Sequence, residues 1–403
     1  MDVPSSIALV FAAVSLPISP RMSRQTILWI CVALNVAGIV LAGCNPKWFE
    51  FRNGVEWAPD GDGIGFGKPG LAYTETFTTQ MDTDRLTGQG LTIEIALRPE
   101  EGRFLGFRHG LRFIAVVHSG DDHSQLLIAQ WRQTIIVMNG DDYDNRRKSP
   151  RLTASVVNHD AGPLFLAARS DGRGTALYIN GKSVATSAGL TLRLPTDDAP
   201  GRLVLGNSVY GDAPWRGTIA GFALHRVALD EDTLRHHLEL WQRDQGFAGD
   251  DYASAQLAYP FSERTSRRAL DRSPYGIDLK FPRETTAIAP KLFPFGIDSL
   301  RRGHPRDIII NLCGFIPLGF FLVALFAEVT PMTRLTAVGA AIAIGFTLSF
   351  GIELAQAWIP SRSSSLLDLL LNIAGSGLGG SAFALFFEEG VPDLICPKVK
   401  KVL

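Results

Sequence analysis

Cysteine is scarce and is missing from the middle of the chain. The sequence has 4 cysteines in 403 residues, at Cys31, Cys44, Cys313 and Cys396. The polar stretch between Cys44 and Cys313 therefore has no internal disulfide and depends on a hydrophobic core, which a region of this length can form. No Cys or His pair has zinc-ligand spacing, because the adjacent His236 and His237 would point in different directions on a helix.

An excess of charge of either sign is missing as well. Lys and Arg number 39 against 40 Asp and Glu, and no basic stripe with interleaved aromatics is present, so no nucleic-acid partner is expected. The chain is 46% hydrophobic and 20% charged, which is too apolar for an average soluble protein and too polar for a pure membrane bundle. A hybrid of a soluble region and a membrane region is expected.

The first long apolar run is TILWICVALNVAGIVLAG, residues 26–43. At ~1.5 Å per residue it is long enough to cross a hydrocarbon layer of ~30 Å. Arg21 and Arg24 precede it, so by the positive-inside rule this end stays in the cytoplasm and the region after it is exported. Residues 1–25 are interpreted as an N-terminal leader.

The end of this run carries a second signal. Leu41-Ala42-Gly43-Cys44 resembles a lipobox, the bacterial motif in which the cysteine is lipidated after cleavage. Residues 26–44 are therefore either a retained transmembrane helix or a lipoprotein signal with Cys44 as the lipidated residue.

Residues 45–290 are polar and rich in Gly and Asp, with short apolar alternation separated by turns. LTIEIALRP at 91–99 and TALYINGKSVA at 175–185 are examples. Asn180-Gly181 predicts a type I′ hairpin, because both central residues of that turn need positive φ. The pattern predicts an all-β antiparallel sandwich.

Four of these stretches, in this order, resemble one fold family. LTIEIALRP, LYINGKSVA, LVLGN at 203–207 and the segment 215–237 are similar to strands of the concanavalin A-like lectin/glucanase jelly roll of the laminin-G type. The segment 215–237 ends in the short helix that usually closes that fold, and 259–282 resembles the strand that pairs the chain ends. The resemblance implies binding of a glycan or cell-wall polymer, with a protein partner as the alternative.

The sandwich contains aromatic and acidic residues that suit such ligands. Tyr178, Tyr210 and Trp215 are candidate glycan contacts, although Trp215 is also a natural core residue of its strand. Calcium is the one candidate cofactor, with oxygen ligands from turn aspartates, which otherwise bond their own backbone; these are Asp121, Asp122, Asp141, Asp142 and Asp144. No pair of Glu has glucanase-like spacing on one strand, so glycan hydrolysis is not expected.

The C-terminal part returns to a membrane composition. After a linker at 291–307, the region 308–390 contains apolar segments that are each long enough to span a bilayer; they are residues 308–327, 333–358 and 366–387. With one earlier span, the tail 391–403 falls in the cytoplasm, and its basic PKVKK fits the positive-inside rule. Arg301, Arg302 and Arg306 fall outside and do not fit it. The predicted protein is thus multidomain, a β-sandwich plus an α-helical transmembrane bundle.

Polar and small residues recur along these apolar segments at intervals of three or four, so that each set lies on one helix face. The sets are Asp307, Asn311 and Gly314; Gly345, Ser349, Glu353 and Gln356; and Asp368, Asn372, Gly375 and Gly379. An ionisable group at the bilayer centre costs roughly 2.5–3.5 kcal/mol, so such groups face a bundle interior or a wet cavity. We expect the three faces to converge near the exported loop that carries Arg362.

The same residues resemble a second family. Asp307, Asn311, Phe315, Pro317 and Gly319, then Glu353 and Gln356, then Arg362, Asp368, Asn372 and Gly375 occur in the order and at the gaps of VanZ-like membrane proteins. That family is associated with the bacterial envelope and with glycopeptide antibiotic resistance. The resemblance implies no particular molecular activity. In this chain the usual first helix is displaced to the N-terminus, and the sandwich is inserted after it.

Three roles are open for the polar cluster Asp307, Asn311, Glu353, Gln356, Arg362, Asp368 and Asn372. It can be a hydrogen-bonded lock between helices, a site for a polar lipid headgroup or cell-wall precursor, or a catalytic carboxylate pair. No nucleophile or metal is evident, so no catalytic residue is assigned. The predicted protein is a multi-pass protein of the bacterial inner membrane with a periplasmic sandwich, in contact with membrane lipid. It is a binding or envelope-maintenance module; the alternatives are a membrane enzyme or transporter for a lipid-linked substrate and a scaffold.

Overall fold

The computed structural model describes residues 23–45, 52–59, 61, 63–67, 69–78, 90–100, 111–120, 122–123, 125–140, 147–156, 163–196, 199–243, 252, 254–264, 266–292, 305–360, 362 and 364–387. The predicted tail 391–403, most of the leader and linker residues 293–304 lie outside these ranges. The chain divides into two units: the β domain, Phe49–Ile288, and the helical unit, made of Met1–Trp48 and Ala289–Leu403.

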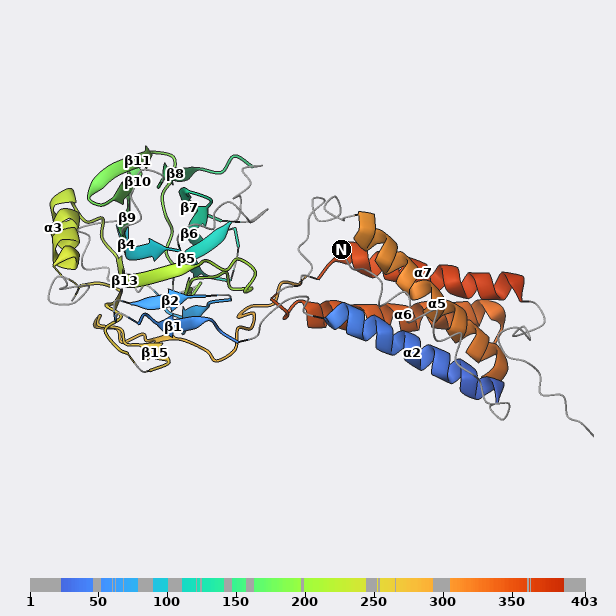
Figure 1. Cartoon of the computed structure of the whole chain (residues 1–403). Coiled ribbons are helices and arrows are strands. Elements are labelled where there is room, and N and C mark those ends of the chain that lie inside the picture. Colours follow the sequence, from blue (N-terminus) through green and yellow to red (C-terminus); the bar gives the residue numbers. More distant parts are fainter. Residues whose placement is uncertain are drawn as a thin grey trace, which may run out of the picture. The chain divides into compact units, whose positions relative to one another are not determined.

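The β domain consists of two antiparallel sheets (Figure 1). In the first, strands follow the order β1-β2-β13-β4-β9-β10-β11, and β14 also pairs with β13. Their bounds are β1 Val55–Trp57, β2 Ile64–Phe66, β4 Gly90–Pro99, β9 Leu164–Asp171, β10 Gly174–Ile179, β11 Lys182–Ser187, β13 Gly217–His225 and β14 Leu257–Tyr259.

The second sheet has the order β15-β16-β3-β12-β5-β6-β7-β8. Its strands are β3 Ala72–Thr74, β5 Arg112–His118, β6 Leu126–Trp131, β7 Thr134–Asn139, β8 Arg151–Ser155, β12 Arg202–Leu205, β15 Arg268–Ala269 and β16 Leu279–Lys280. The predicted sandwich is confirmed. The Asn-Gly hairpin is present too: Ile179 pairs with Lys182 across Asn180 and Gly181, whose φ angles are 49° and 74°.

Alternation along the strands separates two apolar layers. On β4, Ile93 and Ile95 belong to the core between the sheets, whereas Ala96 belongs to a smaller cluster on the outer face of the first sheet. Helix α3, Glu231–Gln242, covers that outer face (Figure 1), with Leu234 and Leu238 in the smaller cluster. Asp230 caps the helix by accepting a hydrogen bond from the Thr233 amide at 2.7 Å.

The two ends of the β domain lie together. Asn53 donates from its side chain to the carbonyls of Leu71 and Pro282, both at 2.8 Å, and its backbone amide donates to Arg283 at 3.0 Å. Arg52 and Glu284 form an isolated antiparallel bridge. The domain therefore begins and ends at one place, as a domain inserted into a connection does.

In its described part, the helical unit contains four helices that are long and apolar enough to cross a membrane. They are α2 Arg24–Cys44, α5 Pro305–Val329, α6 Arg334–Gln356 and α7 Leu366–Phe386. Glycines bring α5 and α7 close together: a Cβ at Gly375 or Gly379 would overlap the carbonyl oxygen of Leu312 or Ile316, respectively. This is the small-residue packing typical of helices in lipid.

Polar contacts define the two ends of the unit. At one end, the start of α2 meets the end of α5, since the Gln25 side chain donates to the Glu328 carbonyl at 3.3 Å and Arg24 lies 4.0 Å from the Glu328 carboxylate. Arg334 of α6 donates there to Ala384 of α7 at 2.9 Å. The other end, which we call the polar end, contains the end of α2, the start of α5 and the α6–α7 link 357–365.

Candidate functional site

At the polar end, Glu353 joins α6 to α7. Its side chain is 2% exposed, and its Oε2 accepts the backbone N–H of Ser365 at 2.7 Å. Ser365 is the N-cap of α7 and itself accepts from the Asp368 amide at 3.3 Å. A carboxylate beside the first turn of a helix satisfies a free N–H and complements the helix dipole. Glu353 thus sets where α7 begins.

Gln356 and Arg362 bind the end of α2. Gln356 Nε2 donates to the Gly43 carbonyl at 2.9 Å. Arg362 donates from Nη2 to the Ala42 carbonyl at 2.8 Å and from Nε to the Asn45 carbonyl at 3.1 Å. The last carbonyls of a helix have no intrahelical partner, and a cation there is favourable. Both side chains therefore hold α2 against the α6–α7 link.

Asn372 and Asp368 complete the links between helices. Asn372 Nδ2 donates to Ser349 Oγ of α6 at 2.8 Å, while Asp368 is hydrogen-bonded to the Asn311 side chain of α5. Asn372 Oδ1 is buried and has no hydrogen-bond partner among the described residues. An unsatisfied buried acceptor costs ~1–3 kcal/mol. Asn372 Oδ1 can therefore still accept a hydrogen bond from a donor outside this network.

The cluster as a whole is acidic. Arg362 interacts electrostatically with Asp307, Glu353 and Asp368, and also with Cys44. Burial lowers the pKa of the Arg362 guanidinium and these neighbours oppose the shift; an arginine remains charged regardless. The structure thus brings together the predicted polar residues at one end of the bundle, with Asp307 exposed at its edge. Gly314, expected on the same face, has open space around it instead.

The Glu353 contact leads to a prediction. Glu353→Ala removes the acceptor of the half-buried Ser365 amide and is expected to lower the free energy of unfolding by ~1–3 kcal/mol. Glu353→Gln keeps an acceptor oxygen and should cost less than ~1 kcal/mol. Thermal unfolding of the full chain in lipid nanodiscs measures both. Equal stability of the Ala and Gln variants would contradict a capping role for Glu353.

The candidate glycan contacts differ in exposure. Trp215 has no exposed surface and donates from Nε1 to Gln130 Oε1 at 2.7 Å. Tyr178 is buried in the cluster under α3, and its hydroxyl donates to Glu231 at 3.1 Å. Neither ring faces solvent. Tyr210 is half-buried and donates to the Asp122 carboxylate at 2.9 Å, so it is the member of the three that a ligand can approach.

Of the turn aspartates, Asp122 is described; Asp121, Asp141, Asp142 and Asp144 lie outside the described residues. Cys44 is the last residue of α2 and half-buried; its lipidation stays a prediction.

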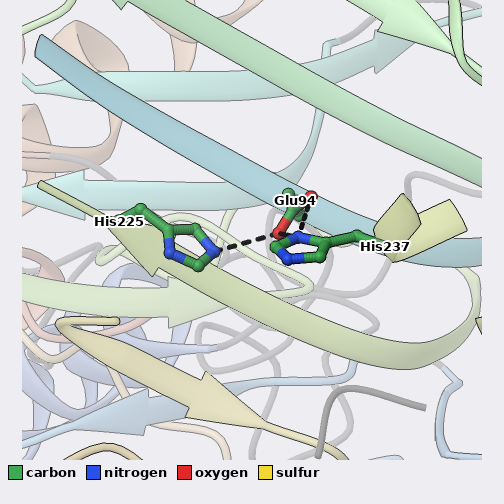
Figure 2. A group of neighbouring side chains, drawn as sticks. All are labelled: Glu94, His225 and His237. Carbon is green, nitrogen blue, oxygen red and sulfur yellow. Dashed lines mark hydrogen bonds and ion pairs between the residues drawn. The ribbon is translucent and has the colours of Figure 1, made fainter. Parts of the chain in front are cut away.

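A further polar cluster lies under α3 and was missed by sequence reasoning. Glu94 of β4, His225 of β13 and His237 of α3 point toward one another (Figure 2). Glu94 Oε2 lies 2.9 Å from His225 Nε2, and both Glu94 oxygens lie 3.0 Å from His237 Nδ1. The three residues are 0%, 1% and 2% exposed.

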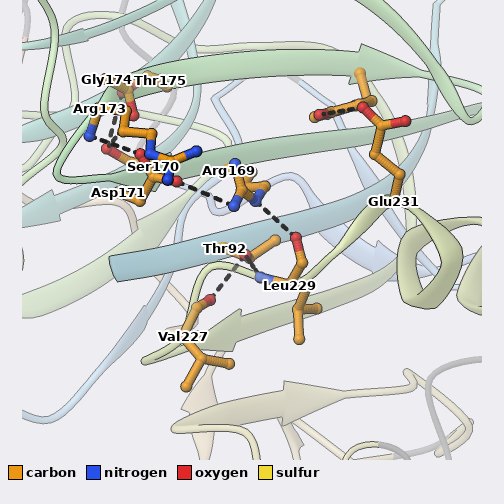
Figure 3. Close-up of polar contacts among 11 residues, drawn as sticks. Thr92, Arg169, Ser170, Asp171, Arg173, Gly174, Thr175, Val227, Leu229 and Glu231 are labelled. Atoms are coloured by element: carbon orange, nitrogen blue, oxygen red, sulfur yellow. Dashed lines mark hydrogen bonds and ion pairs between the residues drawn. The ribbon is translucent and has the colours of Figure 1, made fainter. Parts of the chain in front are cut away.

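Hydrogen bonds around this cluster hold the β13–α3 connection on the sheet (Figure 3). Thr92 Oγ1 donates to the Val227 carbonyl at 2.8 Å and accepts from the Leu229 amide at 2.9 Å. Arg169 Nε donates to the Leu229 carbonyl at 2.7 Å and pairs with Asp171 at 3.0 Å. The path from His225 to His237 is therefore well anchored to β4 and β9.

Electrostatics favour an ionised Glu94. Burial alone would raise the pKa of Glu94, but hydrogen bonds from His225 and His237 and their charge outweigh burial, so the pKa lies below its usual value. The ring of Tyr252 packs 4.6 Å from that of His237 and 5.8 Å from that of His225. His225 Nδ1 has no hydrogen-bond partner among the described residues.

Comparison with family models identifies both regions. Residues 76–235 match the concanavalin A-like lectin/glucanases superfamily, and residues 259–387 match VanZ/LLP1. The VanZ/LLP1 match starts at the end of β14 and includes α5, α6 and α7, whereas α2 lies before it. Both predicted resemblances are confirmed. No curated protein matches the chain.

Solved structures with some likeness to the chain are distant. A candidate carbohydrate binding protein from Bacteroides ovatus shares 14% identity at a TM-score of 0.36, over 53% of this chain and 56% of that one. The Ruminococcus gnavus sialidase CBM40 bound to α2,3 sialyllactose shares 14% identity at a TM-score of 0.31, over 43% of this chain and 95% of that one. A pentraxin from Limulus polyphemus shares 12% identity at a TM-score of 0.29, over 46% of this chain and 82% of that one.

The fold, the apolar helices and the two family matches lead to one assignment. The chain is a membrane protein in which residues 76–235 are similar to the concanavalin A-like lectin/glucanases superfamily and residues 259–387 are similar to VanZ/LLP1, the latter containing three of the four apolar helices found among the described residues.

Proposed function

We propose that the protein is a module of the bacterial envelope, anchored in the inner membrane, whose β domain binds a glycan or cell-wall polymer in the periplasm. The observation that carries this is a domain of the lectin/glucanase superfamily inserted between two apolar helices, α2 and α5. Such an arrangement tethers a binding surface to a bilayer and raises its effective concentration near envelope polymers.

The arrangement of the helices supports the orientation. The chain leaves α2 and re-enters α5 at the polar end, while Arg24 and Arg334 lie at the opposite end. By the positive-inside rule the end with Arg24 and Arg334 faces the cytoplasm. Protease added to spheroplasts is expected to degrade the β domain. A protected β domain would reverse this topology.

Glycan binding is tested on the full chain in nanodiscs, with a glycan array and with sedimentation on purified peptidoglycan. Tyr210 is the accessible candidate, so Tyr210→Ala is expected to weaken binding by about tenfold or more, equivalent to ~1.4 kcal/mol. Tyr275→Ala is the matched control, because Tyr275 is a 53% exposed tyrosine of the same domain. A blank array together with no sedimentation on peptidoglycan would remove the lectin function.

A second candidate function belongs to the polar cluster. Among the described residues, its Asn372 Oδ1 is a buried acceptor without a hydrogen-bond partner, and three carboxylates surround the Arg362 guanidinium. This charge balance favours a ligand with hydrogen-bond donors or a positive group over a phosphate, since Arg362 already donates to Ala42 and Asn45. Mass spectrometry of lipids that co-purify with the wild type and with Asp368→Asn tests it. Identical lipid content in both would leave the cluster with its structural role alone.

The association of VanZ-like proteins with glycopeptide resistance extends the proposal to antibiotic tolerance. A strain without the protein is expected to be more sensitive to glycopeptides, and Glu353→Gln should fail to restore tolerance if the cluster binds an envelope precursor. Full restoration by Glu353→Gln at normal protein level would indicate that the carboxylate acts in packing only.

A further inference from the structure

We propose that Glu94, His225 and His237 bind one divalent transition-metal ion, most suitably Zn²⁺, which fastens α3 to the first sheet of the β domain. These residues include neither the glycan-contact candidate Tyr210 nor any member of the polar cluster, so the inference stands whether or not the proposed function holds.

The geometry of the three side chains suits a metal. One ligand atom from each residue lies within 4.8 Å of the others, and the oxygen–nitrogen distances are 2.9 and 3.0 Å. Zinc bonds of ~2.0–2.2 Å in a tetrahedron put neighbouring ligand atoms about 3.3–3.5 Å apart. To hold an ion, the two oxygen–nitrogen distances would lengthen by a few tenths of an ångström, and the two ring nitrogens, which lie within 4.8 Å of each other, would close on the ion.

The charge of the cluster also calls for a cation. Glu94 has no exposed surface, and a buried carboxylate without compensation is strongly unfavourable. Among the described residues, its ion-pair partners are His225 and His237, and neither Lys nor Arg pairs with it. A divalent ion would take over the positive charge that His225 and His237 otherwise supply by binding protons, and both imidazoles would then be neutral, which is the form in which histidine ligates metals.

The ligand atoms indicate which metal would bind, and the burial indicates that its role would be structural. Two imidazole nitrogens and one carboxylate oxygen suit Zn²⁺ and related first-row ions, whereas Ca²⁺ and Mg²⁺ prefer oxygen ligands alone. The 0–2% exposure of the three residues leaves no approach for a substrate. The ion would therefore act structurally, joining β4, β13 and α3, which are far apart in the sequence.

The test uses the purified full chain without a polyhistidine tag. Elemental analysis of the wild type is expected to find about one zinc ion per chain. Removal of the ion with a strong chelator should lower the melting temperature, and adding Zn²⁺ back should restore it. Co²⁺ added to the stripped protein should give the visible ligand-field bands of a tetrahedral site.

Matched variants identify the ligands. His237→Asn should lose the bound metal, whereas His236→Asn, on the neighbouring exposed histidine of α3, should keep it. Glu94→Gln has nearly the same shape as the wild type but lacks the charge, so it should bind Zn²⁺ more weakly. This variant tests the proposal if His237→Asn fails to fold. A metal-free wild type that gives no Co²⁺ bands and no Zn²⁺-dependent melting shift would overturn the proposal, leaving a proton-sharing ion pair. Retention of the metal by His237→Asn would overturn it as well.

Discussion

Gly379→Val is expected to disassemble the helical unit while leaving the β domain folded. A side chain at Gly379 would overlap the carbonyl oxygen of Ile316 and also approach the Phe320 amide of α5. Backbone atoms in a helix cannot rotate away as a side chain can, so α5 and α7 must separate. We expect a loss of about 3 kcal/mol or more, at or beyond the upper end of typical overpacking costs.

The control is Gly314→Val, because a Cβ at Gly314 of α5 has no atom within 4 Å. The measurement is thermal unfolding in nanodiscs, with size-exclusion chromatography in detergent to detect aggregated protein. A Gly379→Val protein as stable as Gly314→Val would show that α5 and α7 do not pack through this glycine.

Trp215→Ala is expected to destabilise the β domain by ~3–5 kcal/mol, as for other buried aromatic truncations. Trp215 has no exposed surface, packs edge-on against Phe66 with ring centres 6.0 Å apart, and donates to Gln130. Truncation leaves a cavity and also leaves Gln130, which is 2% exposed, without this donor.

Trp131→Ala is the control, since Trp131 belongs to the same sheet as Gln130 but is 46% exposed. Hydrogen exchange resolved by peptide follows the strands of the sandwich separately from the helices. Amide exchange in β5, β6 and β12 should accelerate strongly in Trp215→Ala and little in Trp131→Ala. Unchanged protection in Trp215→Ala would mean that the sandwich core does not depend on this side chain.

Local sequence patterns predicted which segments form strands and hairpins, but not which strands lie next to one another in the sheets. Alternation in LTIEIALRP identifies a strand because side chains on opposite faces of β4 meet different layers, and Asn180-Gly181 identifies a hairpin because its geometry is local. The position of β13 beside both β2 and β4 depends on pairing between distant segments. No short-range pattern encodes such pairing.

The same difference between local patterns and distant contacts decides which candidate site could be predicted. Glu353, Asp368 and Asn372 recur at helical spacing, so their convergence could be predicted. Glu94, His225 and His237 come from three elements, and a search for closely spaced ligands cannot find them. A faint signal exists: Glu94 is the one charged residue in LTIEIAL, at a position flanked by buried apolar residues. For Trp215, residue type alone did not distinguish a core side chain from a binding platform.

The insertion of the β domain between α2 and α5 imposes an order on biosynthesis. About 260 residues separate Cys44 from Pro305, which at ~5–20 residues per second takes tens of seconds to translate. During that interval α2 lacks Gln356 and Arg362, which later cap its terminal carbonyls. The β domain thus has time to fold before the ribosome has delivered the helices α5 and α6, which pack against α2.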